Sequence, residues 1–326
     1  MTHPEYHRQQ GAALIMVLLA MALISILAVN SSEKIRYNSA RVSNQSDHSQ
    51  AYWYALGAEA FARAILKKDI QAVTINLEQD WATSEAIFPI EGGALQGSIT
   101  DLHRCFNVNA LAEGSVEGNT LPPAHRQFNA LMSALDLPDE SAEKLRERIR
   151  DWTDPDATAS GFQGMEYGYS TDSGISYQPP NAPVFDISEL RLFTDLAADE
   201  LNQVLPFLCS LPDDPTLAIN INTLGTEEAV LLVALLGDTL SLQEATELIE
   251  ARPAAGFSSF DALWHMPQLK DKTIPEDGKA TISLKSTYFR TDIQVHYQNI
   301  RRIYHAWFKI NKDNLDTLAR QYGERL

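Results

Sequence analysis

The chain has 326 residues, more than one average domain needs, and its 44% hydrophobic and 21% charged residues are ordinary for a folded protein. Its 43 acidic residues outnumber the 26 basic ones, and the net charge of -17 would repel a phosphate backbone, which excludes nucleic acid as the expected partner. The two cysteines, Cys105 and Cys209, form no C-x-x-C pair and no Cys/His cluster, so a zinc site is not expected.

A long apolar segment follows a short polar stretch at the N-terminus. Residues 12–29 contain a single polar residue, Ser25, and as a helix they would be roughly 27 Å long. That length is close to the hydrocarbon thickness of a bilayer, so the segment predicts a transmembrane helix. The alternatives are a buried core helix and a cleaved secretory signal. The segment is too long for a signal, however, and no convincing small-x-small cleavage site follows it.

The sequence after the span predicts that the same helix continues into the soluble part of the protein. Residues 30–69 contain no proline and a single glycine, and their apolar positions begin seven apart at Ile35 and Val42 and become denser further along. This pattern is typical of an amphipathic helix. We therefore expect one continuous helix from Ala12 to about Lys68, roughly 85 Å long.

Strand patterns flank the middle of the chain. Residues 94–109 alternate enough for one or two strands, and residues 281–311 contain period-two runs with a break near 297–301. The second stretch fits two or three antiparallel strands. Together, the long helix and these strands predict a small α+β head made of residues 33–111 and 281–326.

The region between these strands, residues 112–280, is predicted to be an all-helical domain with proline-rich and acidic loops. Start signals such as Ser188 and Ser241, each ahead of acidic residues, support several of its helices. The predicted fold class is α+β, with a long N-terminal helix and a large helical domain inserted before C-terminal antiparallel strands. The expected helices of the insertion are 123–135, 139–152, 187–193, 198–207, 226–236, 242–251 and 259–265.

An acidic loop in this middle region has two possible explanations. Asp154 and Asp156 alternate with Pro155, and Glu166 follows ten residues later in a glycine-containing stretch without a strand pattern. Calcium takes about six to eight oxygen ligands and accepts irregular loops, so an ion could neutralise these carboxylates and order the loop. The loop could equally be solvated, with Asp151 and Asp154 capping a helix and a turn. The spacing is not that of an EF-hand, and the residues alone leave both explanations open.

The second half of the middle region, about 212–270, looks like a helix-hairpin-helix unit around Gly237. Such units can bind the DNA backbone through a hairpin of amides and basic residues. Residues 212–280 carry twelve acidic and four basic residues, a net charge of -8, so we expect a unit that packs against protein. The chain contains neither G-x-S-x-G nor H-E-x-x-H, and its eight histidines are scattered, so an anchored hydrolase is not expected.

Several segments of the sequence carry a family signature. The leader MTHPEYHRQQG ends in Gly11 directly before the span, DLHRCFNVNAL contains a Phe-Asn-x-Asn motif, and ININT precedes the hairpin unit. The most specific stretch combines Asp-Trp-x-Asp-x-Asp, a glycine-rich loop, a Tyr-x-Pro-Pro-Asn turn and a Ser-Glu-Leu helix. Its residues are Asp151, Trp152, Asp154, Asp156, Glu166, Tyr169, Tyr177, Pro179, Pro180, Asn181, Ser188, Glu189 and Leu190. These segments resemble the K-type minor pseudopilins of bacterial type II secretion systems.

The resemblance implies a prepilin-type leader, residues 1–11, which a prepilin peptidase removes after Gly11 before the new N-terminus, Ala12, is methylated. It implies that residues 12–32 cross the bacterial inner membrane once and carry a pilin-like head in the periplasm. Most pseudopilins have Glu at the fifth mature position, where it is thought to pair with the subunit above, whereas this chain has Met16. A subunit with no neighbour above has no use for that costly carboxylate, so Met16 fits a tip subunit.

The resemblance also implies partners and a function. The partners are the I-type and J-type minor pseudopilins, other pseudopilins and the inner-membrane assembly platform, and the function is to start a periplasmic pseudopilus that exports folded proteins across the outer membrane. The alternatives are a minor pilin of a type IV pilus, which would lack the helical insertion, and a membrane-tethered helix-hairpin-helix DNA-binding protein, which should be basic. The orientation rests on the resemblance, because the positive-inside rule alone would reverse it. The charges concerned are Arg8 before the span and Lys34, Arg36 and Arg41 after it.

The resemblance favours calcium over a solvated loop. K-type pseudopilins bind calcium in their helical domain, which implies Asp154, Asp156 and Glu166 as ligands in this chain. Asp151 and Asp172 are weaker candidates. We therefore expect calcium as the cofactor, with no catalytic residue.

The two cysteines are expected to pair if the protein is exported. Exported domains commonly carry disulfides, so Cys105 and Cys209 suggest one bridge, and two buried free thiols are the alternative. A bridge would tie the entrance of the helical insertion to its middle. Closing a loop of about a hundred residues could contribute on the order of 4 kcal/mol.

Overall fold

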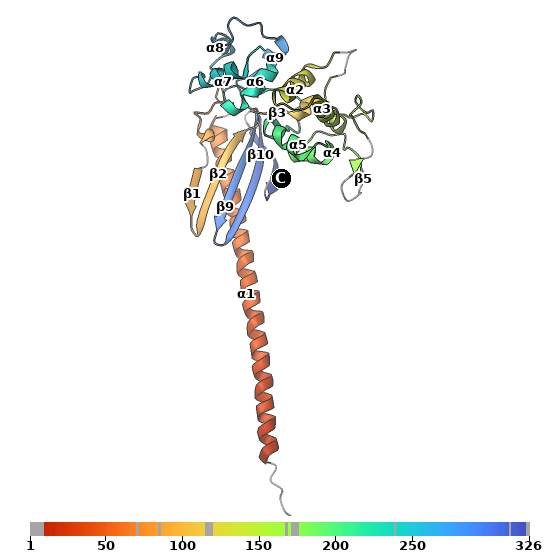
Figure 1. Cartoon of the computed structure of the whole chain (residues 1–326). Helices are drawn as coiled ribbons and strands as arrows, with labels where there is room; N and C mark the ends of the chain where they lie inside the picture. Colours follow the sequence, from red (N-terminus) through yellow and green to blue (C-terminus); the bar gives the residue numbers. More distant parts are fainter. Residues whose placement is uncertain are drawn as a thin grey trace, which may run out of the picture.

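Helix α1, Gln10–Asp69, extends far beyond the rest of the protein (Figure 1). Its 60 residues give a rod about 90 Å long, in agreement with the predicted continuous helix. The C-terminal part packs on the head through one face, on which Ala51, Ala55, Ala62 and Leu66 recur at helical spacing and are buried. The structure is a computed structural model that describes residues 10–69, 72–83, 86–114, 120–166, 169–170, 176–237, 239–312 and 314–323.

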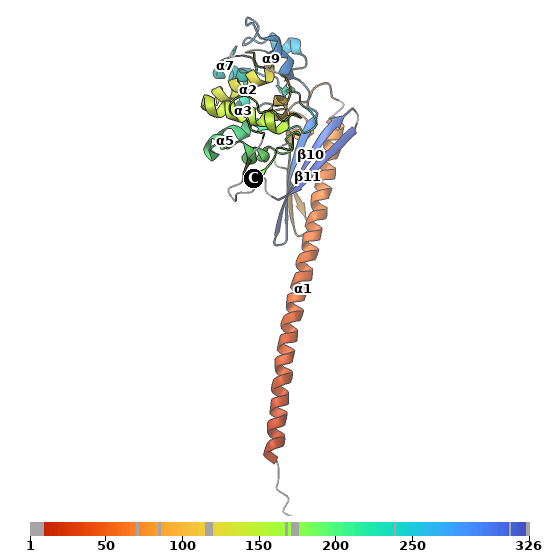
Figure 2. The same cartoon turned by 90° about the vertical axis from the view of Figure 1, so that its right-hand side faces the viewer.

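A five-stranded antiparallel sheet packs against the C-terminal part of α1, in the order β1-β2-β9-β10-β11 (Figure 2). Alternate side chains of its strands, among them Phe289, Tyr304 and Phe308, form a core with the buried face of α1. Trp81, in the short 3-10 helix Asp80–Ala82, belongs to the same core. The strands are Ala86–Ile90 (β1), Gly93–Asp101 (β2), Tyr288–Tyr297 (β9), Ile300–Asn311 (β10) and Asn314–Tyr322 (β11).

The two edge strands, β1 and β11, lie outside the stretches that the sequence analysis assigned to strands. β1 contains Pro89, and β11 is mostly polar, so neither has the pattern of a strand with a buried face. Edge positions tolerate both features because one side of each edge strand makes no ladder hydrogen bonds. The central strands β2, β9 and β10 fall where the alternation predicted them.

A mostly helical domain lies at the end of the head that is farthest from the N-terminus of α1 (Figures 1 and 2). Its core includes Phe128 and Leu231 and extends from Phe106 to Leu284, so it uses side chains from both sides of the predicted limits, 112–280. The helices are Pro123–Ala134 (α2), Asp139–Thr153 (α3), Leu190–Phe193 (α4), Ala198–Val204 (α5), Ala229–Leu235 (α6), Leu242–Glu250 (α7), Phe260–Trp264 (α8) and Glu276–Thr281 (α9).

The helix start signals were predicted in part. Ser241 caps α7 by accepting a hydrogen bond from the backbone N–H of Glu244, as expected. Ser188 is not a cap, because the turn that leads into α4 begins at Asp186, whose carboxylate accepts from the N–H of Ser188. Helix α9 was missed, since its six residues are too few to show a helical period.

The helical domain is inserted between two neighbouring strands. β2 and β9 are hydrogen-bonded neighbours, although β2 ends at Asp101 and β9 begins at Tyr288. The predicted α+β class, with a helical domain ahead of C-terminal antiparallel strands, is confirmed. Short strand pairs complete the insertion: Phe106–Asn107 (β3) with Leu208–Cys209 (β6), Tyr169–Ser170 (β4) with Ser176–Tyr177 (β5), and Ile219–Asn220 (β7) with Ile282–Ser283 (β8).

Candidate functional site

The first part of α1 presents an apolar surface that the rest of the protein does not cover. Its most apolar 18-residue window has a mean hydropathy of 2.9 and is 0% buried, and by length and composition α1 is the one described helix that could cross a membrane. Leu14 and Ile24 are 62% and 66% exposed. Such a surface requires lipid or the apolar helices of other subunits. Gly11 and Ala12 lie at the beginning of this helix, and Met16 is 70% exposed on its surface.

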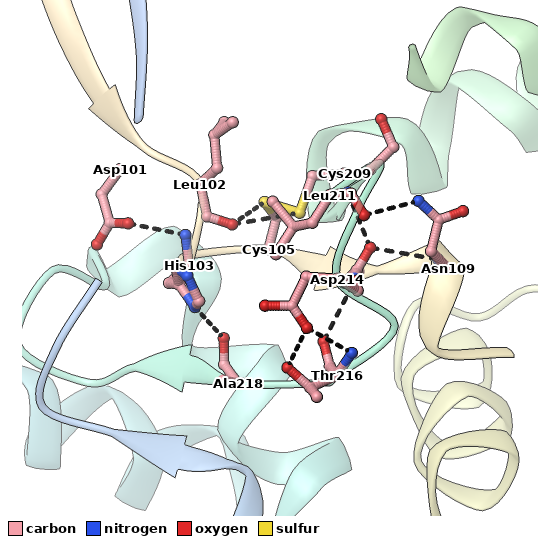
Figure 3. The surroundings of a disulfide bond; sticks show 12 residues. Asp101, Leu102, His103, Cys105, Asn109, Cys209, Leu211, Asp214, Thr216 and Ala218 are labelled. Atoms are coloured by element: carbon pink, nitrogen blue, oxygen red, sulfur yellow. Dashed lines mark hydrogen bonds between the residues drawn. A yellow bond between two sulfur atoms is a disulfide. The ribbon is translucent and has the colours of Figure 1, made fainter. Parts of the chain in front are cut away.

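A disulfide closes the point at which the helical domain leaves the sheet (Figure 3). It joins Cys105, just before β3, to Cys209 at the end of β6, with a Cα–Cα distance of 5.7 Å. This is the pairing that the sequence analysis expected, and the structure leaves neither cysteine free. The bridge ties the entrance of the insertion to a segment 104 residues further along the chain.

A buried carboxylate fixes the same junction. Asp101, at the end of β2, is 1% exposed and accepts hydrogen bonds from the backbone N–H of His103 at 2.8 Å and from the hydroxyl of Thr223 at 2.6 Å. The hydroxyl of Ser286, on the returning chain, donates to the same carboxylate. Both chain crossings and the helical domain therefore meet at one buried carboxylate. Since these donors satisfy its buried oxygens, the network holds the domain in one orientation on the head.

Three carboxylates come together in the loop that follows α3. Asp154, Asp156 and Glu166 each offer one oxygen, and these oxygens all lie within 4.8 Å of one another. Asp154 and Glu166 are buried, whereas Asp156 is exposed. Asp154 and Asp156 also line a cavity of about 850 Å³, so the group can be reached from solvent. The structure thus brings together the three residues that the resemblance put forward.

Two other acidic side chains hold the backbone of this loop. Asp151, in the last turn of α3, accepts a hydrogen bond from the N–H of Ser160 at 2.9 Å, and Glu147, one turn earlier, accepts from the N–H of Gln163 at 2.8 Å. The loop passes so close to Glu147 that a Cβ at Gly161, where φ is +58°, would lie 2.1 Å from the carboxylate. The backbone conformation favours glycine at that position, and any side chain there would also have to displace the Glu147 carboxylate.

Asp154 and Glu166 have oxygens that the protein leaves without a partner. Among the described residues, no donor bonds Asp154 Oδ1 or Glu166 Oε1, although both atoms are buried. Burial, followed by the charges of Asp156 and Asp151, raises the pKa of Asp154 to about 6. Burial and the charges of the neighbouring aspartates raise the pKa of Glu166 to about 7. A cation at this point would remove both penalties, because it would pair the orphaned oxygens and offset the repulsion.

The geometry of the cluster fits calcium. The ion binds oxygens at about 2.3–2.6 Å, so two ligands of one ion lie at most about 5 Å apart, and the spread of 4.8 Å is within that limit. All donors in the cluster are hard carboxylate oxygens, which calcium prefers over nitrogen or sulfur. The three side chains would supply part of the coordination shell, and the open cavity leaves room for water ligands.

The weaker candidates and the supporting residues have different roles. Asp172 lies outside the described residues. Asp151 uses its carboxylate to hold the loop, although its charge is felt by both Asp154 and Glu166. Glu147 was not singled out from the sequence. The sequence did contain a signal for Glu147. It lies four residues ahead of Asp151, so on a helix both side chains lie on the same side and face the loop.

Comparisons with known proteins identify the family to which this chain is similar. Two family models described as type II secretion system (T2SS), protein K, match residues 104–213 and 219–285. Type II secretion system protein K of Aeromonas hydrophila is 33% identical over 326 residues, which cover 98% of each chain. The protein of the same description from Klebsiella pneumoniae is 34% identical over 320 residues, which cover 97% of each chain.

A solved structure shares the architecture as well. A chain of the GspK-GspI-GspJ complex from the type 2 secretion system of enterotoxigenic Escherichia coli superposes with a TM-score of 0.77 at 29% sequence identity. The match covers 87% of this chain and 100% of that one. Over the part of this chain that the match covers, the two proteins share one mixed α+β architecture. Sequence and fold both lead to the conclusion that this chain belongs to the type II secretion system protein K family.

Proposed function

We propose that the chain is the minor pseudopilin at the tip of a periplasmic pseudopilus, where it starts assembly and thereby supports the export of folded proteins across the outer membrane. The observation that carries this proposal is the position of the helical domain. It lies on the end of the head that is farthest from the apolar part of α1 (Figures 1 and 2). Subunits that stack along parallel spine helices would meet this domain from above, and it leaves no room for a further head there.

Met16 supports the same position in the assembly. The fifth residue after the proposed cleavage site is an exposed apolar side chain, so it offers no carboxylate to the N-terminal amine of a subunit above. A carboxylate without that amine is costly inside the hydrocarbon. A subunit that only has neighbours beside and below it avoids this cost.

The proposed partners are the I-type and J-type minor pseudopilins. The related crystal structure contains these proteins in one complex with GspK, which supports the same association here. Other pseudopilins and the inner-membrane assembly platform would follow as the pseudopilus grows. We further propose that a prepilin peptidase removes residues 1–11 after Gly11, that Ala12 is then methylated, and that the protein crosses the inner membrane once with its head in the periplasm.

Calcium is the proposed cofactor, and its role would be structural. Asp154, Asp156 and Glu166 would hold the ion, while Asp151 and Glu147 hold the loop around it. Arg150 lies 3.6 Å from one oxygen of Asp154, and the ion would supply the further positive charge that offsets the repulsion among the three carboxylates. No proposed step requires a nucleophile or a general base, and the proposal is an assembly protein rather than an enzyme.

The first experiment combines processing with assembly. The full chain is expressed with I-type and J-type partners, with and without the prepilin peptidase, and is isolated from membranes for mass spectrometry. The proposal predicts an N-terminus at Ala12 only in the presence of the peptidase, together with co-isolation of both partners. A chain that begins at Met1 in both samples, or that is cut near Asn30, would contradict the pseudopilin assignment. A correctly processed chain without either partner would contradict the tip position.

A further inference from the structure

A bare segment of α1 separates the apolar span from the head. We call residues 30–46 the neck. Every side chain of the neck is exposed, and the first half-buried side chains of α1 beyond the span are Asp47 and His48. The neck therefore contributes nothing to the folded head, and its sequence is free to serve another purpose.

The charge of the neck is opposite to that of the whole protein. The neck contains three basic residues, Lys34, Arg36 and Arg41, and one acidic residue, Glu33, which gives a net charge of +2 in a chain of net charge -17. None of the three cations makes an ion pair or hydrogen bond with any other described side chain. Three unpaired cations on a helix that touches nothing else indicate an anionic partner from outside the chain.

The height of these cations above the span matches the headgroup layer of a bilayer. At about 1.5 Å per residue, Lys34 lies roughly 8 Å and Arg36 roughly 10 Å beyond the last apolar residue, Val29. The headgroup region is about 5–8 Å thick on each side of the hydrocarbon. Side chains of a helix lean toward its N-terminus, which is the membrane side here, so both cations reach back into that layer. Arg41, roughly 18 Å away, lies outside that layer even with its side chain extended, but the headgroup charges are within about one Debye length, ~8–10 Å, and attract it without direct contact.

The distribution of the cations around the helix distinguishes a lipid from a protein partner. At about 100° per residue, Lys34 and Arg41 lie within about 20° of each other, whereas Arg36 lies about 160° away, on the opposite face. A partner helix packs along one face only and would leave Arg36 or the other two cations unpaired. Phospholipid headgroups surround the helix on all sides, so they can contact Lys34 and Arg36 on opposite faces and attract Arg41 from a short distance.

We propose that the neck binds the phosphate groups of anionic phospholipids in the leaflet that faces the head. This inference rests on the proposed membrane anchoring of α1. The contacts fix how deeply the apolar span sits and hold the head at a constant height above the bilayer. Lys34, Arg36 and Arg41 lie on the head side of the membrane, contrary to the positive-inside rule, and these lipid contacts would explain their presence there.

The test measures the lipids next to the protein. The processed full chain is reconstituted into phosphatidylcholine vesicles that contain some phosphatidylglycerol, and spin-labelled forms of both lipids report which one is enriched at the protein surface. A cation at the membrane surface changes local binding by about fivefold. We therefore expect the wild type to prefer phosphatidylglycerol at least about fivefold, and the variant K34Q/R36Q/R41Q to lose most of that preference. Added salt should weaken the wild-type preference, because it screens exposed charges.

A matched control removes the same amount of charge elsewhere. Lys270, Lys285 and Lys312 are exposed, belong to the head or the helical domain, and make no ion pair with a described residue. The variant K270Q/K285Q/K312Q has the same net charge as the neck variant and should keep the wild-type lipid preference. An equal loss in both variants would overturn the proposal, because the effect would then come from total charge.

Other outcomes separate this inference from the proposed function. A chain that does not float with the vesicles would overturn the membrane anchoring itself. A chain that floats but shows no lipid preference would overturn the headgroup contacts alone. If the neck variant keeps its lipid preference but no longer co-isolates with the I-type and J-type partners, an acidic protein surface occupies the neck and the lipid proposal is wrong.

Discussion

At the scale of single residues, the carboxylates near the end of α3 form two groups, those whose oxygens accept backbone hydrogen bonds and those with buried oxygens that have no donor. Glu147 and Asp151 accept backbone hydrogen bonds from the loop, whereas Asp154 and Glu166 keep buried oxygens without a donor. The sequence resemblance indicated the candidate ligands, but it ranked Asp151 beside them as a weaker one. Asp151 holds the loop through the backbone N–H of Ser160, nine residues further along the chain, and no spacing rule predicts that contact.

The unpaired oxygens of Asp154 and Glu166 predict how calcium and pH together affect the stability of the folded protein. Without the ion, the folded-state pKa values of about 6 for Asp154 and about 7 for Glu166 lie above the ordinary 3.8 and 4.5. The folded state then binds more protons than the unfolded state, so the calcium-free protein loses stability as the pH rises through this window. Calcium requires the charged carboxylates, so its stabilising effect should grow over the same window. We expect it to raise the Tm clearly at about pH 8 and hardly at all at about pH 5.5.

Thermal unfolding with calcium and with a chelator, at several pH values, measures this effect. At a hundredfold excess over the Kd, calcium should add about 2.7 kcal/mol, or roughly 5–10 °C for a domain of this size. The variant D154N/E166Q should be more stable than wild type in chelator at neutral pH and should not respond to calcium. Asp271→Asn, an exposed acid outside the cluster, is the control and should behave as wild type. A calcium response that persists in D154N/E166Q would place the ion elsewhere.

At the scale of elements, the long helices followed their sequence patterns, while the edge strands depended on contacts distant in sequence. β11 is attached to α1 by Arg320, which donates two hydrogen bonds of 2.8 Å to the carboxylate of Glu59. Glu59 is 3% exposed on the buried face of α1, and Tyr304 also donates to it. These partners are separated by about 250 residues, so the polar sequence of β11 alone could not show that it forms a strand.

Arg320→Met should weaken the attachment of β11 to α1. The substitution leaves the Glu59 carboxylate buried without its guanidinium, but Arg320 itself is 47% exposed, so we expect a loss of about 1–3 kcal/mol rather than the 3–5 kcal/mol of a fully buried pair. Urea unfolding measures the difference. Arg320→Lys, which keeps the charge but not the two parallel hydrogen bonds, should fall between wild type and Arg320→Met. Unchanged stability in Arg320→Met would show that the pair does not hold the strand.

The same pair predicts a response to acid. Burial alone would raise the pKa of Glu59, but the hydrogen bonds from Arg320 and Tyr304 outweigh it and lower the pKa below the ordinary 4.5. A carboxylate with a lowered folded-state pKa contributes stability above its ordinary pKa and loses it as the pH falls further. The stability gap between wild type and Arg320→Met should therefore be constant near neutral pH and shrink below about pH 4.5. A gap that widens in acid would contradict the assigned charge state.

The disulfide should stabilise the junction mainly through the length of chain that it closes. Cys105 and Cys209 are separated by 104 residues, and closing a loop of that length removes up to about 4.7 kcal/mol of unfolded-state entropy. We expect the variant C105S/C209S to unfold at clearly lower urea than the oxidised wild type, and reductant to lower the wild type to a similar midpoint. Reductant should leave the variant unchanged. Equal midpoints for the oxidised wild type and the variant would show that the bridge is not a source of stability.

At the scale of the whole molecule, the order of domains was predictable and their relative placement was not. Helical patterns between two strand-like stretches indicated an insertion, and β2 and β9 on either side of it confirm that arrangement. The orientation of the inserted domain depends on Asp101 and its partners Thr223 and Ser286, which are distant in sequence. Asp101 and Thr223 belong to the signature segments DLHRCFNVNAL and ININT, but nothing in those segments indicates that the two side chains meet. Because this network directs the domain away from the membrane helix, it decides what can sit above the head.

Removing the helical domain should therefore release the block on further stacking. Asp101 at the end of β2 pairs with Phe289 in β9, so the two strands can be joined directly by a short turn in place of residues 102–287. The head retains its own core between α1 and the sheet, because that core contains no residue of the removed segment. We expect pseudopili that contain the shortened subunit to be longer than those with the full chain. The measurement is their length distribution by electron microscopy, in cells where the shortened chain still co-isolates with its I-type and J-type partners. Unaltered lengths under that condition would mean that the helical domain does not act as a cap.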